Sequence, residues 1–220
     1  MIAGSRRRTI LVAALVAALG TACASGKSTP EVTHDGLHLV AHSSMEHTWV
    51  KPGEDFSQYN RVGLLDCFVA FQKHWQLNHP DVRTYDIDRI KKSLSEEFRK
   101  VFTEELQKNG YPIVTAPGKD VLLVRPAIID LEISAPDTME DVSSVTFTTS
   151  AGSMALYVEL YDSVSDEILA RAVDRRGANH IGGVEETSYS TNSDDARRLL
   201  KHWADLLVQK LDEVHGKKRG

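Results

Sequence analysis

Cysteine is scarce in this 220-residue chain, which contains only Cys23 and Cys67. No Cys-x-x-Cys motif occurs, no Gly-rich phosphate-binding loop precedes an expected helix, and Gly152-Ser153 lacks the Gly-x-Ser-x-Gly frame of a hydrolase nucleophile. Seven prolines and 14 glycines are too few for a collagen-like or low-complexity chain. From these absences we predict no catalytic residue, no cofactor and no metal site.

The composition is that of a folded, acidic protein. Hydrophobic residues make up 41% of the chain, which is enough for a packed core. The 26 Lys and Arg residues are outnumbered by 31 Asp and Glu, so the formal net charge is −5. An acidic chain does not favour phosphate backbones, and we therefore predict no nucleic-acid partner.

The first 22 residues are predicted to be a signal peptide rather than part of the fold. Three arginines, Arg6 to Arg8, precede a short apolar run from Ile10 to Leu19. That run is about half of the roughly 20 apolar residues that a membrane-spanning helix needs, so it is typical of an export signal. The Arg7-Arg8 pair leaves twin-arginine export open as an alternative route. Removal of residues 1–22 takes away three arginines and changes the formal net charge to −8.

The segment Gly20-Thr21-Ala22-Cys23 resembles the lipobox of bacterial lipoproteins, although Leu19 stands one place earlier than the usual Leu. The resemblance implies cleavage before Cys23, a diacylglycerol on its sulfur and an acyl group on its new amine. The predicted partner is therefore a lipid bilayer, reached through acylated Cys23. Ala24 follows Cys23 where an Asp would retain a lipoprotein in the inner membrane, so by analogy we expect the outer membrane, facing the periplasm.

The mature chain divides into three parts. Residues 23–55 are interpreted as the lipid anchor, a flexible tether rich in small polar residues, and an N-terminal extension. Residues 56–215 are expected to form the folded domain, and residues 216–220 a basic tail.

Two segments of the domain have the periodicity of amphipathic helices. In the segment 86–109, apolar residues recur at steps of mostly three and four, and Gly110 is placed to end the helix. The segment from about 192 to 215 repeats the pattern. The expected buried residues are Ile87, Ile90, Leu94, Phe98, Val101, Phe102 and Leu106 in the first, and Ala196, Leu199, Leu200, Trp203, Leu207, Leu211 and Val214 in the second.

The remaining apolar segments are predicted to be strands, over 62–71, 121–133, 145–162 and 168–174, with a hairpin turn at 162–166. In the second strand we expect Val121, Leu123, Ala127, Ile129, Leu131 and Ile133 to share one face. In the third we expect Met154, Leu156, Val158 and Leu160 to do so. The order of elements predicts a two-layer α+β domain, in which an antiparallel or mixed sheet of four to five strands carries two amphipathic helices on one face.

Four histidines precede the domain. His34, His38 and His42 would line one face of a helix, with His47 nearby, and could then hold zinc or copper. Gly36 and the alternation around His38 favour an extended chain instead. A metal-handling protein that uses the segment from His34 to His47 therefore remains only an alternative.

Four aspartates lie at or near strand ends, namely Asp66, Asp130, Asp162 and Asp174. Such carboxylates could form an acid/base pair in a periplasmic enzyme with an unrecognised carboxylate or His site, which is the second alternative. We interpret them instead as groups that satisfy turn amides. The arginines at 171, 175 and 176 are interpreted as a strand-end ion-pair set rather than a grip for an anionic ligand.

Two further features have contrasting interpretations. Cys67 lies in the apolar run 62–71 and is interpreted as a small buried residue rather than a reactive thiol. The polar segment 177–192 is a long loop that carries His180, Glu185, Glu186 and Tyr189, and long loops are often functional. A mobile surface connection is the alternative for this loop.

The order of several short motifs resembles the bacterial lipoprotein family catalogued as domain of unknown function 3313. The matching pieces are Asp35-Gly36-Leu37, Lys51-Pro52-Gly53, Lys73-His74-Trp75, Asn109-Gly110-Tyr111, residues 153–163, residues 170–176 and the end of the last helix, between about Asp35 and Asp212. The resemblance implies a small exported lipoprotein, and it transfers no functional residue beyond Cys23. We therefore predict a non-enzymatic binding or envelope-assembly module, with an envelope protein as a possible partner.

Overall fold

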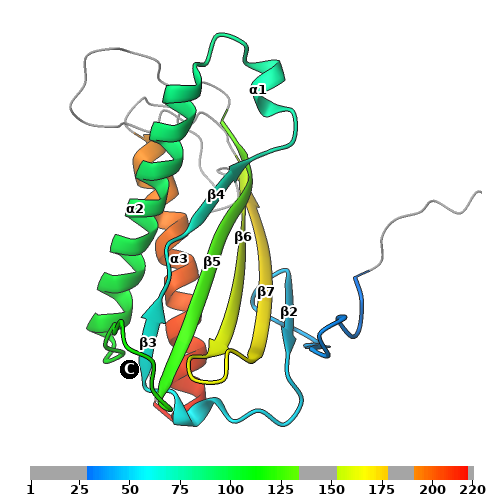
Figure 1. Ribbon diagram of the computed structural model, residues 1–220, viewed down its shortest axis with the longest axis vertical. Coiled ribbons are helices and arrows are strands. Elements are labelled where there is room, and N and C mark those ends of the chain that lie inside the picture. Colours follow the sequence, from blue (N-terminus) through cyan, green and yellow to red (C-terminus); the bar gives the residue numbers. More distant parts are fainter. Residues whose placement is uncertain (1–28, 134–152, 178–190, 218–220) are drawn as a thin grey trace, which may run out of the picture.

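The computed structural model describes residues 29–133, 153–177 and 191–217 of the chain (Figure 1). Its elements are β1 (His38–Leu39), β2 (His47–Val50), the 3-10 turn η1 (Phe56–Gln58), β3 (Arg61–Leu64), β4 (Phe68–Phe71), α1 (Trp75–Asn78), α2 (Thr84–Lys108), β5 (Val121–Glu132), β6 (Ser153–Asp162), β7 (Ile168–Gly177) and α3 (Thr191–Val214).

The strands form one mixed sheet, and the two long helices cover one of its faces. The strand order is β1-β2-β7-β6-β5-β3. Strand β4 pairs with β5 as well, further along that strand than β3 does. Only β3 and β4 run parallel to their neighbour β5; the other pairs are antiparallel. Helices α2 and α3 lie side by side on the same side of the sheet (Figure 1). The predicted α+β class with a mixed sheet is confirmed.

The sheet is larger than the four to five strands that we predicted. It has seven strands among the described residues, and the short α1 and η1 add to the two long helices. Part of the difference comes from the N-terminal extension, because β2 pairs along β7 from His47↔Val173 to Val50↔Ala170 and β1 pairs with β2. These strands are too short to have a clear sequence pattern of their own.

The run 62–71 is two strands rather than the predicted single one. Leu64 lies opposite Val124 of β5, and Phe68 lies opposite Ala127. The chain therefore advances four residues while β5 advances three, and the extra residue interrupts the pairing. The interruption places Asp66 at the surface and buries Cys67.

The predicted inward face of β5 was wrong in the middle of the strand, although Val121 at its start is buried as predicted. Leu122, Val124 and Ile128 are fully buried, whereas the predicted residues Leu123, Ala127 and Ile129 are only half-buried. The pairing with β6 shifts register after Ile129, where Asp130 has a positive φ of 52°. This irregularity returns Leu131 and Ile133 to the core, as predicted. Because apolar residues occur on both faces of β5, alternation alone could not identify the inner one.

Helix α2 buries the residues that its periodicity selects, and α3 buries most of them. The predicted burial of Val214 was wrong: it is 42% exposed, because it lies at the very end of the helix. In α2 all seven predicted residues are buried, and Gly110 adopts a φ of 84° just after the helix, as a left-handed cap requires. In α3 the side chains of Leu199, Leu200, Trp203 and Leu211 are buried against the sheet. Within the described parts of the chain, no helix combines the length and apolar character needed to cross a membrane.

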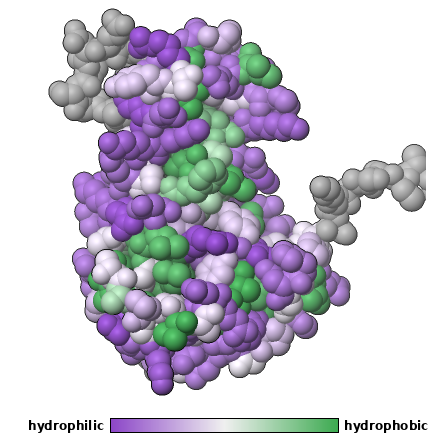
Figure 2. All heavy atoms as spheres, in the orientation of Figure 1, coloured by the Kyte–Doolittle hydropathy of each residue, from purple (hydrophilic) through white to green (hydrophobic). Residues whose placement is uncertain are grey.

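Apolar residues also reach the surface at the opposite edge of the sheet from β1. Leu65 and Phe68 are among the exposed large hydrophobic residues there. Figure 2 shows apolar surface in this part of the molecule, interrupted by polar side chains. Single exposed hydrophobic residues of this kind are normal on soluble domains, so we place the candidate site elsewhere.

Candidate functional site

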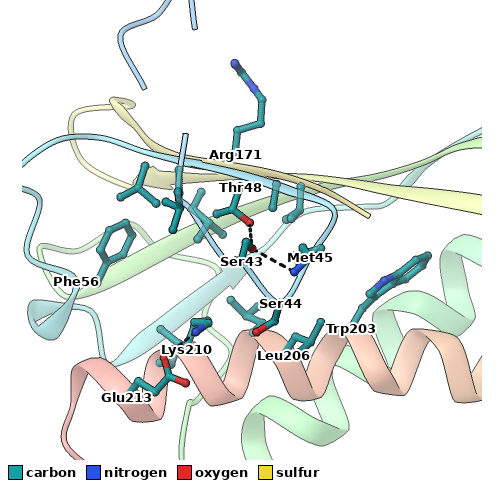
Figure 3. A pocket seen from close by; sticks show the side chains of 18 of the residues that line it. Ser43, Ser44, Met45, Thr48, Phe56, Arg171, Trp203, Leu206, Lys210 and Glu213 are labelled. Carbon is teal, nitrogen blue, oxygen red and sulfur yellow. Dashed lines mark hydrogen bonds and ion pairs between the residues drawn. The ribbon is translucent and has the colours of Figure 1, made fainter. Parts of the chain in front are cut away.

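An apolar cavity of about 320 Å³ lies between α3 and the sheet (Figure 3). Its size falls within the range of about 300–1,000 Å³ that is usual for small-molecule sites. On one side of the cavity, the sheet contributes side chains from β2, β6 and β7. Helix α3 forms the opposite wall, and the segment before β2 closes one side. The residues that form its two main walls are Thr48, Val50, Val158, Leu160, Ala170 and Ala172 on the sheet and Trp203, Leu206, Leu207, Leu211 and Val214 on α3.

The cavity exists because β7 presents two alanines to α3. Cross-strand pairing sets Ala172 between Thr48 of β2 and Val158 of β6. The next row of the same face sets Ala170 between Val50 and Leu160. Each row therefore has its smallest side chain in the middle, which leaves a hollow beneath the large side chains of the helix.

The segment 40–46 crosses the cavity as a side wall. The chain bends at His42, which has a positive φ of 58°, and Ser43 Oγ lies 2.6 Å from Thr48 Oγ1. The backbone N–H of Met45 donates to Ser43 Oγ at 3.1 Å, and Met45 packs against the core. Figure 3 shows Ser43, Ser44 and Met45 between the sheet and α3. These contacts hold the wall in place without adding a charge to the interior.

The charged groups near the cavity are already engaged at its margin. Lys210 Nζ lies 2.8 Å from Glu213 Oε2, and the hydrogen bond from Lys210 lowers the pKa of the Glu213 carboxyl. Arg171 contributes to the lining, but its side chain points away from the cavity (Figure 3). The described lining is therefore mostly apolar, with aliphatic and aromatic side chains, and Ser43, Ser44 and Thr48 contribute hydroxyl groups to it.

The opposite face of the sheet carries a separate ionic cluster around Glu159. This carboxylate is nearly fully buried and accepts hydrogen bonds from Tyr157 at 2.7 Å, Tyr161 at 2.8 Å and Arg171 Nη2 at 2.8 Å. Arg125 Nε donates at 2.9 Å. Burial raises the pKa of Glu159, but these four donors lower it by more, to about 2. The group is a permanent carboxylate at neutral pH.

The tyrosines of this cluster are held in their neutral form. Burial, together with the hydrogen bond to Glu159, raises the pKa of Tyr157 and that of Tyr161 to about 12. Arg171 also binds Asp35, with Nη2 2.5 Å from Oδ2, and this hydrogen bond lowers the pKa of Asp35 to about 2. The cluster thus fastens the N-terminal segment to the sheet. Because every oxygen of Glu159 is occupied, the cluster is suited to structural support rather than to proton transfer.

The four aspartates singled out in the sequence are not brought together. Asp66 pairs with Arg99 of α2, and Asp130 pairs with Arg175 at 2.9 Å. Asp162 closes the hairpin turn, where it accepts from the backbone N–H groups of residues 164 and 165 and from the Tyr59 hydroxyl. Asp174 is buried under α3 and accepts from Trp203. The interpretation as groups that satisfy turn amides is confirmed for Asp162 and is wrong for Asp66 and Asp130, which pair with arginines instead.

The arginines near the end of β7 each have an acidic partner, as the ion-pair interpretation predicts. Arg171 contacts Glu159 and Asp35, and Arg175 contacts Asp130. Arg176 Nε lies 2.8 Å from Asp174 Oδ2. These guanidinium groups are therefore already neutralised by side chains of the same chain.

The histidines do not share a helix face. His38 lies in β1, His42 at the bend after it, and His47 in β2, where its ring nitrogen lies 3.2 Å from Thr29 Oγ1. Over residues 29–133, 153–177 and 191–217, no group of three or more His, Cys, Asp or Glu side chains is placed to hold a metal ion. The extended geometry agrees with the alternation that we noted around His38.

Of the two cysteines, only Cys67 lies among the described residues. Cys67 is buried, and this burial raises the pKa of its thiol to about 12, as expected of a small core residue. Cys23, the predicted lipid-attachment residue, lies outside the described residues. So does most of the loop 177–192, including His180, Glu185, Glu186 and Tyr189.

Fold and cavity together define a two-layer α+β domain with an apolar cavity between its layers. The chain belongs to the family described as "Protein of unknown function (DUF3313)", whose model matches residues 34–207. No curated protein matches the chain.

Several solved structures share parts of the fold at low similarity. A PelC dodecamer from Paraburkholderia phytofirmans is 11% identical, with a TM-score of 0.37 over 76% of this chain and 96% of that one. A putative neuraminyllactose-binding hemagglutinin homolog from Helicobacter pylori is 14% identical, with a TM-score of 0.34 over 74% of this chain and 88% of that one. Similarity at this level carries no argument about function.

Sequence reasoning did not find the cavity. It identified the packed faces of β6 and α3, through Leu156, Val158, Trp203 and Leu207, but it treated them as filled core. The available signal was the pair Ala170 and Ala172, two small residues at alternate positions of a strand whose partners carry larger side chains. Only the register across β2, β7 and β6 shows that both alanines face α3.

Proposed function

We propose that this chain is a lipid-anchored protein of the bacterial cell envelope whose domain binds an apolar ligand without catalysing a reaction. The cavity between α3 and the sheet carries the proposal. Its lining is mostly apolar, Lys210 and Glu213 at its margin neutralise each other, and Arg171 points away from it, so it favours apolar groups over ions or sugars. A domain of this family with such a cavity acts as a binding module.

The anchoring part of the proposal rests on the N-terminal residues. The arginines at 6–8, the apolar run 10–19 and the small residues before Cys23 support export and lipidation. Acyl chains on Cys23 would hold the domain at the bilayer, since each buried methylene contributes about 0.8 kcal/mol. By the sorting analogy, the location is the outer membrane facing the periplasm, where an envelope protein is the expected partner.

Binding can be tested with an apolar fluorescent dye, N-phenyl-1-naphthylamine. The mature chain, residues 23–220 with Cys23→Ser, avoids the need for detergent, which would compete for the cavity. We expect a saturable rise in fluorescence that Ala170→Leu abolishes, because the added methyl groups fill the space beneath α3. Val173→Leu is the matched control, since Val173 lies on the same strand but faces away from α3. Equal dye binding by both variants contradicts the proposal, provided that both melt like the parent.

Anchoring has its own test, in the native host. Cys23→Ser should yield an uncleaved or soluble protein, because the sulfur that carries the lipid is missing. Fractionation of the envelope, with detection of the protein by antibody, shows the difference. A Cys23→Ser protein that is still processed and membrane-bound contradicts the anchor.

A further inference from the structure

We propose that the occupant of the cavity is a single unbranched hydrocarbon chain of an amphiphile. This inference rests on the proposed function and adds the chemical class of the ligand. It is carried by three features of the cavity: its length along α3, its cross-section, and the difference between its two ends.

The cavity is longer than it is wide. It extends along α3 from Trp203 to Val214, eleven residue steps that span about 16 Å at the helical rise of about 1.5 Å per residue. Across the sheet its floor is formed by Ala170 and Ala172 of β7, between larger side chains of β2 and β6 on either side. Neighbouring strands lie about 4.8 Å apart, so these flanking strands are about 10 Å apart from backbone to backbone. A trough of this shape suits an extended chain better than a fused ring system.

The two ends of the cavity differ. At one end Trp203 is 2% exposed, and its indole N–H is held by Asp174, so this end is closed. At the other end Val214 is 42% exposed, and Lys210 and Glu213 lie beside it. Figure 3 shows Trp203 part-way along α3, with Lys210 and Glu213 towards the end of the helix at the left of the view. A chain therefore enters near Val214 with its methyl end pointing towards Trp203.

The mouth does not select one sign of charge. Lys210 and Glu213 form an ion pair at 2.8 Å and present both signs to a head group. Of the other charged residues in the described lining, Arg171 is engaged by Asp35 and Glu159 on the far side of the sheet, so it does not bind a second polar group of the ligand. Recognition therefore depends on the length of the chain and only weakly on the charge of its head.

The test is a series of straight-chain carboxylates from eight to sixteen carbons, each displacing N-phenyl-1-naphthylamine from the Cys23→Ser mature chain. Affinity should rise roughly fourfold for each added methylene, the equivalent of about 0.8 kcal/mol. The rise should stop near thirteen carbons, because each carbon advances a chain by about 1.25 Å and the cavity is about 16 Å long. At fixed length, phosphocholine or trimethylammonium heads should change Kd by less than about tenfold.

A variant can shorten the cavity from its closed end. Ala172 lies between Ala170 and Asp174 on β7, so Ala172→Leu places methyl groups near the closed end. We expect the plateau to move to chains several carbons shorter, with short chains bound as before. Val173→Leu, on the opposite face, should leave the plateau unchanged. If Ala172→Leu does not fold, the chain-length series measured on the parent protein still tests the proposal.

The outcomes separate this inference from the proposed function. If the dye binds but no chain displaces it, or if the fused-ring amphiphile cholate displaces it better than every chain, the chain proposal is overturned and the binding module stands. If affinity is independent of chain length, the chain proposal also fails. If neither the dye nor any chain binds, the proposed function itself is wrong.

Discussion

The indole N–H of Trp203 donates a 2.8 Å hydrogen bond to Oδ2 of Asp174, and both side chains are buried. Asp174 also accepts from the backbone N–H of Glu46 at 3.0 Å and pairs with Arg176. One carboxylate on β7 thus connects α3, the segment before β2 and the end of its own strand. These are three of the elements that enclose the cavity.

Truncation of Trp203 should destabilise the domain severely. Trp203→Ala removes a fully buried ring and leaves a hydrogen bond of Asp174 unmade, which together should lower the free energy of unfolding by about 3–5 kcal/mol. Trp203→Phe keeps most of the packing and should cost about 1–3 kcal/mol, the loss of one hydrogen bond to a buried carboxylate that keeps its bonds to Glu46 and Arg176. Urea denaturation measures both. Leu77→Ala, at a side chain that is 75% exposed, is the control and should lie within about 0.5 kcal/mol of the parent.

The Glu159 cluster should make the domain sensitive to acid. The pKa of Glu159 is lowered from 4.5 to about 2 in the folded protein, so the folded state binds fewer protons than the unfolded state between these values. Its contribution to stability is therefore complete above pH 4.5 and is lost as the pH falls towards 2. Urea midpoints measured from pH 5 to pH 2 should fall steeply in the parent.

The matched variant for this effect is Glu159→Gln. It lacks the titrating group, so its midpoint should be lower at neutral pH and should change less between pH 4.5 and pH 2. Asp35, whose pKa is also lowered to about 2, contributes a similar but separate dependence. Parallel profiles for the parent and Glu159→Gln would contradict the assignment.

The positive φ of Asp130 makes this position selective for side-chain shape. Asp130→Val places a β-branched residue at φ 52° and should lower the free energy of unfolding by about 1–3 kcal/mol. Asp130→Asn tolerates this backbone and removes only the exposed pair with Arg175, so it should cost less than about 1 kcal/mol. Chemical denaturation of both variants distinguishes backbone strain from loss of charge. Equal losses would mean that the backbone is not strained there.

Cys67 should be unreactive in the folded protein. Burial raises the pKa of its thiol to about 12, so thiolate is scarce at pH 8 and the sulfur is inaccessible. In the Cys23→Ser chain, iodoacetamide should label Cys67 much more slowly than a free thiol, and urea should restore the full rate. Mass spectrometry counts the label. Rapid labelling without urea would show that this part of the core opens readily.

The local patterns of the sequence predicted the long elements well. The helical steps placed α2 and α3 within a few residues of their observed bounds, and the alternation in β6 placed Met154, Leu156, Val158 and Leu160 on the core side. Asp162 was correctly assigned to the hairpin turn and Cys67 to the core. These features depend on contacts between residues close in the chain, or on one amphipathic face, so the residue order contains the information.

The inner face of β5, the break between β3 and β4, and the strands β1 and β2 were not predicted. Each depends on pairing with a strand far away in the sequence. The register of β5 against β6 decides which of its two apolar faces is buried, and β1 and β2 form because β7 offers them an edge.

The sequence by itself determined the class of fold, the two helices and the acidic net charge, whereas export stays a prediction from its N-terminal residues. Only the tertiary structure decided that Ala170 and Ala172 lie beneath Leu206 and Leu207 with space between them. A cavity is the difference between the room that several elements enclose and the volume of the side chains they direct into it. That difference depends on residues of β2, β6, β7 and α3 together, and no local pattern in the chain records it.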